Sequence, residues 1–224
     1  AWGDLTLKSL DAGQPQLFAG TKGSHLYSTH QGLRASLGGH GIYAEAADGR
    51  LVFILPCGEG TLIGTTDLPF ADSPGEAIAG GDEVDYLLEM VNSVFDPETV
   101  TLTREDVEMR HAGVRPLPHV EAARTAAIPR GHSIHESNLG IVHVLTLIGG
   151  KLTTCRALAG EVTERVLAER SQESLVRSDS RIVPGGEDWP ESPGALEEKH
   201  RQLSARYDLT EAQTRTVWSL MGNR

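Results

Sequence analysis

Residues 141–154 read Ile141-Val142-His143-Val144-Leu145-Thr146-Leu147-Ile148-Gly149-Gly150-Lys151-Leu152-Thr153-Thr154, and the hydrophobic period changes within them. The first eight residues are nearly all apolar and many are β-branched, which predicts a strand inside a sheet. After the two glycines, apolar residues recur at helical spacing, at Leu152, Cys155, Ala159, Val162 and Val166. This spacing predicts a helix over about 151–169.

The junction between this strand and this helix can bind a negatively charged group. A helix N-terminus presents unpaired backbone N–H groups and a partial positive charge. Gly149 and Gly150 let the backbone approach a ligand closely, and Lys151, Thr153 and Thr154 add a cation and two hydroxyls. A tight strand-to-helix connection with a surface lysine explains the same residues, so the junction alone does not establish a site.

The chain before this junction alternates strand, turn and helix signals. Four strands are predicted between residues 22 and 67, joined as a meander by turns at Asp48-Gly49 and Gly58-Glu59-Gly60. Apolar residues at helical spacing follow Asp82, which is placed as the helix cap. Further segments are a strand over 107–114, a loop over 115–118 and a strand over 131–135.

Several polar side chains in this region are candidates for substrate contact. Arg115 and Arg130 each lie beside proline or glycine, and an arginine fork suits phosphate. His25 follows a glycine turn and can move protons near neutral pH. Thr65 and Thr66 offer hydroxyls that can orient a substrate. Each also has an ordinary reading, as a surface ion pair, a partly buried histidine or a turn hydroxyl bonded to local backbone.

Composition restricts the function classes. The 224 residues carry a net charge of -11, so the chain as a whole repels nucleic acid, and any anion site must be local. Cys57 and Cys155 are far apart and are read as reduced thiols, and the histidines show no metal-ligand spacing, so no structural metal is expected. The longest apolar run is too short to span a bilayer, and a cytoplasmic location is expected.

The chain after the junction changes in composition. Residues 171–194 are rich in Ser, Pro, Gly and charge and are read as a linker. Two short amphipathic helices are predicted beyond it, the second capped by Thr210. This organisation predicts a domain over 1–175, followed over 176–224 by the linker and the start of a helical domain.

Four motifs, taken in their order along the chain, resemble the FAD-dependent glycerol-3-phosphate dehydrogenase family. The four motifs together are more specific for this family than any one of them alone. The motifs are Lys22-Gly23-Ser24-His25, Ile63-Gly64-Thr65-Thr66-Asp67, Gly113-Val114-Arg115-Pro116-Leu117 and Gly149-Gly150-Lys151-Leu152-Thr153-Thr154. The resemblance runs from about Gly20 to the C-terminus. It implies an α+β fold: a substrate-binding domain built on a mixed β-sheet, then a partial helical C-terminal domain.

The resemblance also implies a reaction, in which a hydride passes from sn-glycerol 3-phosphate to the flavin of FAD and dihydroxyacetone phosphate forms. By position in the motifs, Arg115 and Arg130 resemble residues around the substrate phosphate, and His25 and Lys151 resemble residues near the reacting hydroxyl. Thr65 and Thr66 resemble substrate-orienting hydroxyls. The turn resembles the cofactor contact of the family, at Gly149, Gly150, Lys151, Leu152 and Thr153. Quinone or oxygen would accept the electrons, and a peripheral membrane association of the whole protein is left open.

The sequence departs from the family pattern in two ways. Cys155 stands where the family usually has tyrosine, which is read as a local packing change. No GxGxxG motif follows a strand and opens a helix, because no helical pattern follows Gly38-Gly39-His40-Gly41. We therefore expect the chain to lack the N-terminal Rossmann segment that grips FAD, and to be inactive in isolation.

Two other functions remain as alternatives. A flavin oxidase of the amino-acid or glycine oxidase type shares a glycine-pair turn before the last helix, but it would bind a carboxylate and need fewer cations. A non-catalytic binding domain is the second alternative. Retention of yellow flavin by the purified chain would distinguish them.

Overall fold

The computed structural model describes residues 1–10, 13, 15–120, 128, 131–174 and 176–223. The chain divides into two compact units, residues 1–158 and 159–224. The helix α4 (Cys155–Glu169) begins in the first unit and continues in the second. A domain boundary at residue 175 stays a prediction. The combination of strands and helices confirms the α+β class.

One sheet organises the first unit. Six described strands form it: β1 (Phe18–Ser28), β2 (Ile42–Glu45), β3 (Leu51–Cys57), β4 (Gly60–Gly64), β5 (Leu68–Pro69) and β6 (Met109–Pro118). The order is β2-β3-β4-β1, with β5 beside β1 on the β4 side and β6 on the other side of β1. Every pairing in this sheet is antiparallel.

The two predicted turns are confirmed, whereas the meander is wrong for its first strand. Gly49 and Gly58 adopt positive φ, +82° and +55°, in the turns of the β2-β3 and β3-β4 hairpins. β1 pairs with β4 and is separated along the chain from β2 by a short helix, α2 (Gln31–Ser36), which the sequence pattern did not indicate. Leu33 of α2 is completely buried and ties this helix to the core.

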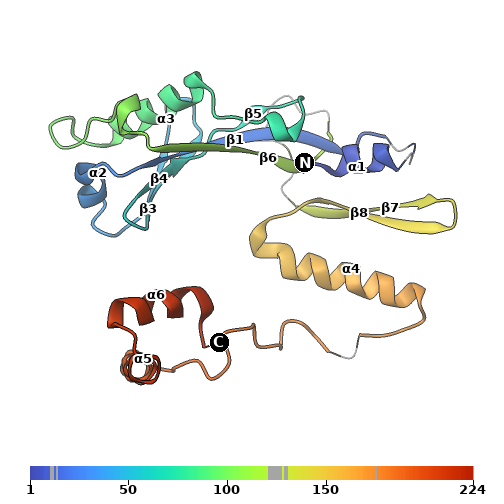
Figure 1. Ribbon diagram of the computed structural model, residues 1–224. Coiled ribbons are helices and arrows are strands. Elements are labelled where there is room, and N and C mark those ends of the chain that lie inside the picture. Colours follow the sequence, from blue (N-terminus) through green and yellow to red (C-terminus); the bar gives the residue numbers. More distant parts are fainter. Residues whose placement is uncertain (11–12, 14, 121–127, 129–130, 175, 224) are drawn as a thin grey trace. The chain divides into compact units, whose positions relative to one another are not determined.

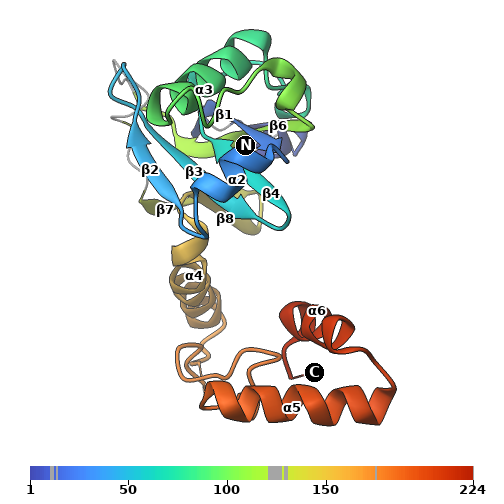
Figure 2. The same cartoon turned by 90° about the vertical axis from the view of Figure 1, so that its left-hand side faces the viewer.

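The helix α3 (Gly81–Val94) lies across one face of the sheet (Figures 1 and 2). Its buried residues Val84, Leu87, Leu88 and Val91 pack in one cluster with Leu26, Val52, Ile54 and Ile63 of the strands. The helical period therefore predicted both the helix and its buried face. The predicted cap at Asp82 is wrong, because the helix begins after Gly80, whose N–H donates to the Glu83 carboxylate at 3.0 Å.

Three short helical segments complete this part of the first unit. They are α1 (Gly3–Ser9), η1 (Pro74–Glu76) and η2 (Arg104–Asp106). The carboxylate of Asp4 in α1 accepts hydrogen bonds from the N–H groups of Leu17 at 3.0 Å and Phe18 at 3.2 Å. These two bonds hold α1 at the start of β1.

The strand β6 is longer than its sequence pattern indicates. Residues 115–118 continue the strand instead of forming the predicted loop, and Arg115 pairs with Thr21 of β1. Proline is compatible with a strand at the edge of a sheet, where one side of the backbone has no ladder partner. On its side away from β1, β6 pairs with no other described strand, so Pro116 and Pro118 break no hydrogen bond there.

The strand, turn and helix predicted over residues 141–169 are present, but the strand is not inside the large sheet. β8 (Val142–Gly149) pairs only with β7 (His132–Leu139) among the described strands, as an antiparallel hairpin. Ile141, at the turn of this hairpin, is fully exposed. A 3-10 turn, η4 (Leu152–Thr154), leads from Gly150 into α4 and confirms the predicted helix.

The second unit contains α5 (Pro193–Tyr207) and α6 (Glu211–Met221), a pair of helices joined by a short connection (Figure 2). The predicted cap is confirmed, because the Thr210 side chain accepts a hydrogen bond from the Gln213 N–H. His200 and Trp218 are buried where the two helices meet, with their rings edge to face at 5.3 Å.

Among the described residues, no helix is both long enough and apolar enough to cross a membrane.

Candidate functional site

The register of β1 and β6 places two of the predicted site residues on one face of the sheet. Thr21, Gly23 and His25 of β1 lie directly opposite Arg115, Gly113 and His111 of β6, in that order. Residues opposite each other in an antiparallel pair point to the same face, and this face alternates with the one that carries Leu26. Since Leu26 packs in the core with α3, His25 and Arg115 lie on the sheet face away from α3.

Arg115 is held by the segment that follows β4. Its Nη1 donates to Asp67 Oδ1 at 3.0 Å, and its Nη2 donates to Thr65 Oγ1 at 3.0 Å and to the Thr66 carbonyl at 3.2 Å. The guanidinium lies over Gly23, where any Cβ would clash with it. The structure therefore brings Arg115, Thr65 and Thr66 together, and adds Asp67 as a carboxylate that offsets the arginine charge.

His25 lies on the same face, packed over a second glycine. A Cβ at Gly64 would clash with the His25 ring, so the ring occupies the space that a side chain at position 64 would need. Burial lowers the pKa of His25 below its ordinary value, and the neighbouring His111 and Arg115 lower this pKa further. At neutral pH the imidazole is therefore uncharged and able to accept a proton.

A buried carboxylate supports this site from the opposite face. Glu83 of α3 is 5% exposed and forms an ion pair with Lys22 at 2.7 Å. Its Oε1 accepts hydrogen bonds from the Ser24 hydroxyl at 2.8 Å and the Thr66 hydroxyl at 2.7 Å. The hydroxyl of Thr66 thus donates to the buried Glu83 carboxylate, while the Thr66 carbonyl accepts a hydrogen bond from Arg115.

Sequence reasoning did not single out His111, Asp67 or Glu83. A signal existed for His111, because it lies four residues before Arg115, and an even separation in a strand places two side chains on one face. Asp67 was present in a quoted motif but had no assigned role. Glu83 had no short-range signal, since its partners come from β1 and from the segment after β4.

The remaining predicted site residues lie at the turn after β8. Gly149 and Gly150 adopt positive φ, +73° and +91°, and the Gly150 N–H donates to the Gly131 carbonyl at 3.2 Å. Lys151, Leu152 and Thr153 are exposed, and Leu152 is 88% exposed. The turn therefore presents the start of η4 and α4 to solvent, where backbone N–H groups favour an anion.

The turn lies beside the end of the strand that carries Arg115. A Cβ at Gly149 would be 3.7 Å from Pro118 Cδ, and Pro118 is three residues beyond Arg115 on β6. Three strand residues correspond to about 10 Å. Arg130 lies outside the described residues.

Replacing Gly149 with alanine should destabilise the protein by more than about 1 kcal/mol, because the Cβ would clash with the Gly131 carbonyl and φ is positive. Gly160→Ala, inside α4 where a Cβ meets nothing within 4 Å, is the control and should be neutral or stabilising. Urea unfolding of both variants measures the difference. Equal stability of the two variants would show that position 149 does not require glycine.

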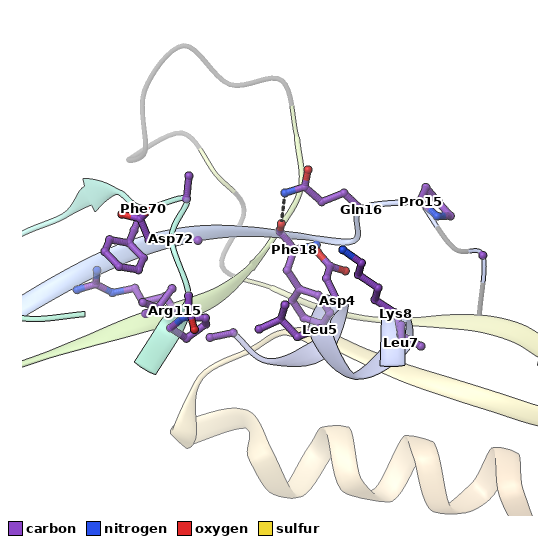
Figure 3. Close-up of a pocket in the computed structure, with 17 residues that line it drawn as sticks. Asp4, Leu5, Leu7, Lys8, Pro15, Gln16, Phe18, Phe70, Asp72 and Arg115 are labelled. Carbon is purple, nitrogen blue, oxygen red and sulfur yellow. Dashed lines mark hydrogen bonds between the residues drawn. The ribbon is translucent and has the colours of Figure 1, made fainter. Parts of the chain in front are cut away.

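A separate pocket of about 840 Å³ lies between α1, the start of β1 and residues 70–74. Figure 3 shows its lining side chains, among them Asp4, Lys8, Phe18, Phe70 and Arg115. The Arg115 side chain extends away from the α1 residues in this view. His25, Thr65 and Lys151 do not line the pocket, whereas Arg115 does, so Arg115 is common to the pocket and to the surface that carries His25.

The described residues contain no group of three or more His, Cys, Asp or Glu side chains arranged to hold a metal ion. Cys57 and Cys155 are free thiols, as expected, and both are exposed.

Comparisons with known proteins agree with the motif order. No family model matches the chain. A glycerol-3-phosphate dehydrogenase of Synechocystis sp. is 34% identical over 200 residues, covering 88% of this chain and 35% of that protein. An aerobic glycerol-3-phosphate dehydrogenase of Escherichia coli is 32% identical over 178 residues, covering 73% of this chain and 34% of that protein.

A solved structure is also similar. The glycerol-3-phosphate dehydrogenase of Bacillus halodurans complexed with FAD matches with a TM-score of 0.80 and 26% identity, over 99% of this chain and 41% of that one. The chain thus spans about a third of the length of the curated relatives named above.

Proposed function

Since the chain belongs to the glycerol-3-phosphate dehydrogenase family, we propose that it forms the substrate-binding part of an FAD-dependent oxidoreductase. The proposed reaction oxidises sn-glycerol 3-phosphate to dihydroxyacetone phosphate. The carbon-bound hydrogen leaves with two electrons as a hydride, and the hydroxyl proton leaves to a base. The observation that carries this proposal is that an uncharged His25 and the guanidinium of Arg115 lie on the same face of the sheet.

The turn after β8 fits the flavin end of FAD. Its two glycines have positive φ, it exposes the start of a helix, and Lys151 adds a positive charge. We assign Gly149, Gly150, Lys151, Leu152 and Thr153 to the cofactor. When bound, FAD accepts the hydride that leaves the second carbon of the substrate.

The protein residues have separate roles in this proposal. His25 accepts the hydroxyl proton, because burial and the neighbouring His111 and Arg115 keep the imidazole uncharged. Arg115 and Arg130 bind the substrate phosphate, with the ion pair to Asp67 holding the Arg115 fork in place. Lys151 polarises the oxygen that becomes the carbonyl. Thr65 orients the substrate, and Thr66 acts through its carbonyl on Arg115.

The decisive experiment measures dye reduction by the complete protein with sn-glycerol 3-phosphate, with and without FAD. FAD-dependent activity that is absent with glycerol and with amino acids is expected. Activity with amino acids instead would favour the amino-acid oxidase alternative. Oxygen consumption measured beside dye reduction separates the two proposed electron acceptors, quinone and oxygen.

Arg115→Ala should lower kcat/KM for sn-glycerol 3-phosphate roughly 10- to 100-fold more than kcat/KM for glycerol, because a charge-assisted contact to phosphate is lost. Arg110→Ala is the matched control, since Arg110 is exposed on the same strand but on the opposite face. Steady-state kinetics with both substrates measures the difference. Equal losses for glycerol and its phosphate would remove the phosphate assignment of Arg115.

A further inference from the structure

His111 of β6 is an exposed histidine directly opposite His25 in the sheet register. The two rings are parallel, with centroids 5.0 Å apart and an angle of 8° between their planes. His25 is confined on its other side by Gly64, where even a Cβ would clash with the ring. The His25 imidazole therefore contacts both the backbone of β4 at Gly64 and the ring of His111.

We propose that His111 is a positioning residue of the site: its ring holds the His25 imidazole over Gly64 of β4 and keeps that imidazole uncharged and able to accept a proton. The inference rests on the proposed function only for the use of His25 as a base. The stack itself is a property of this chain.

The two rings differ in exposure, because His111 is exposed and His25 is half-buried. Two imidazoles at this separation do not both take up a proton readily, because the second charge repels the first. Burial lowers the pKa of His25, and the neighbouring His111 lowers this pKa further.

Two other charged groups lie near His25, and they act in opposite directions. Arg115 of β6 also disfavours a charge on His25. Asp67, after β4, would favour that charge, but its carboxylate is paired with the Arg115 guanidinium. The surroundings of His25 thus favour the base over the imidazolium, and His111 is the member of this set that can be replaced without disturbing the Arg115 contacts.

The first test titrates the His25 ring by NMR in this chain. His111→Phe keeps an aromatic ring in the stack but removes the second imidazole, and His111→Gln removes both the ring and the imidazole. In both variants the titration midpoint of His25 should move to higher pH. His119→Phe, which replaces an exposed histidine just beyond β6, is the control and should leave the midpoint unchanged. An unchanged midpoint in both His111 variants overturns the proposal.

The second test measures the pH dependence of kcat/KM of the complete protein. In His111→Phe the acidic limb should move to higher pH while the rate at high pH is retained, whereas His111→Gln should also lower the rate at high pH because the stack is lost. A loss that is equal at every pH would indicate a merely structural role and overturn the proposal. If the NMR midpoint moves but the acidic limb does not, the stack tunes His25 as proposed and the role of His25 as the base fails instead.

Discussion

Glu83→Ala should lower the free energy of unfolding by about 3–5 kcal/mol, the usual cost of removing one partner of a buried ion pair. Lys22, which is 13% exposed, would lose its carboxylate partner. The hydroxyls of Ser24 and Thr66 and the Gly80 N–H would each lose an acceptor. Urea unfolding of this chain measures the change.

The control for this substitution lies on the same helix. Glu89→Ala removes an exposed carboxylate from α3 and should change stability by no more than about 0.5 kcal/mol. If both variants are equally stable, Glu83 contributes no more to the free energy of unfolding than an exposed glutamate does, and the prediction is wrong.

The same carboxylate gives the stability a pH dependence. Burial alone would raise the pKa of Glu83, but hydrogen bonds from Lys22, Gly80, Thr66 and Ser24 outweigh burial and lower this pKa from 4.5 to about 2. The unfolded state therefore binds the proton more tightly, so the contribution is complete above pH 4.5 and is lost as the pH falls toward 2. As the pH falls from 4.5 toward 2, the free energy of unfolding should decrease more steeply for the natural chain than for Glu83→Ala.

Gly23→Ala should lower the turnover of the complete protein about 100-fold, because the new Cβ would displace the Arg115 guanidinium from Asp67 and Thr65. A displacement of about 1 Å at a binding group is enough for an effect of this size. The Arg115 side-chain resonances in NMR spectra of this chain should change at the same time.

The matched control is the glycine directly across the ladder. Gly113 pairs with Gly23, but a Cβ at Gly113 meets nothing within 4 Å, so Gly113→Ala should leave the Arg115 resonances in place. Unchanged Arg115 resonances in Gly23→Ala would show that the guanidinium does not depend on the missing side chain.

Local sequence patterns predicted the elements whose signal is short-range. The period of α3, the glycine turns of the β2-β3-β4 hairpins and the Thr210 cap all depend on residues within a few positions of one another. The family resemblance implied that Thr65, Thr66 and Arg115 all contact the substrate, but their direct contacts with one another were not predicted, since nothing in their spacing required these segments to meet.

The features that the sequence did not indicate depend on distant partners. The apolar run of β8 resembles a strand buried inside a sheet, yet it pairs in a hairpin with β7, because strand pairing is decided by the fold and not by hydrophobicity. The prolines after Arg115 suggested a loop, but the edge position of β6 allows them in a strand.

Thr66 has a consequence for the thermodynamics of substrate binding. Its hydroxyl is part of the buried Glu83 cluster, and its carbonyl accepts from Arg115. The conformational entropy that Arg115 loses on being ordered is therefore lost when the protein folds, before any ligand arrives. A preorganised guanidinium loses less entropy on association, so the substrate meets a group already in place.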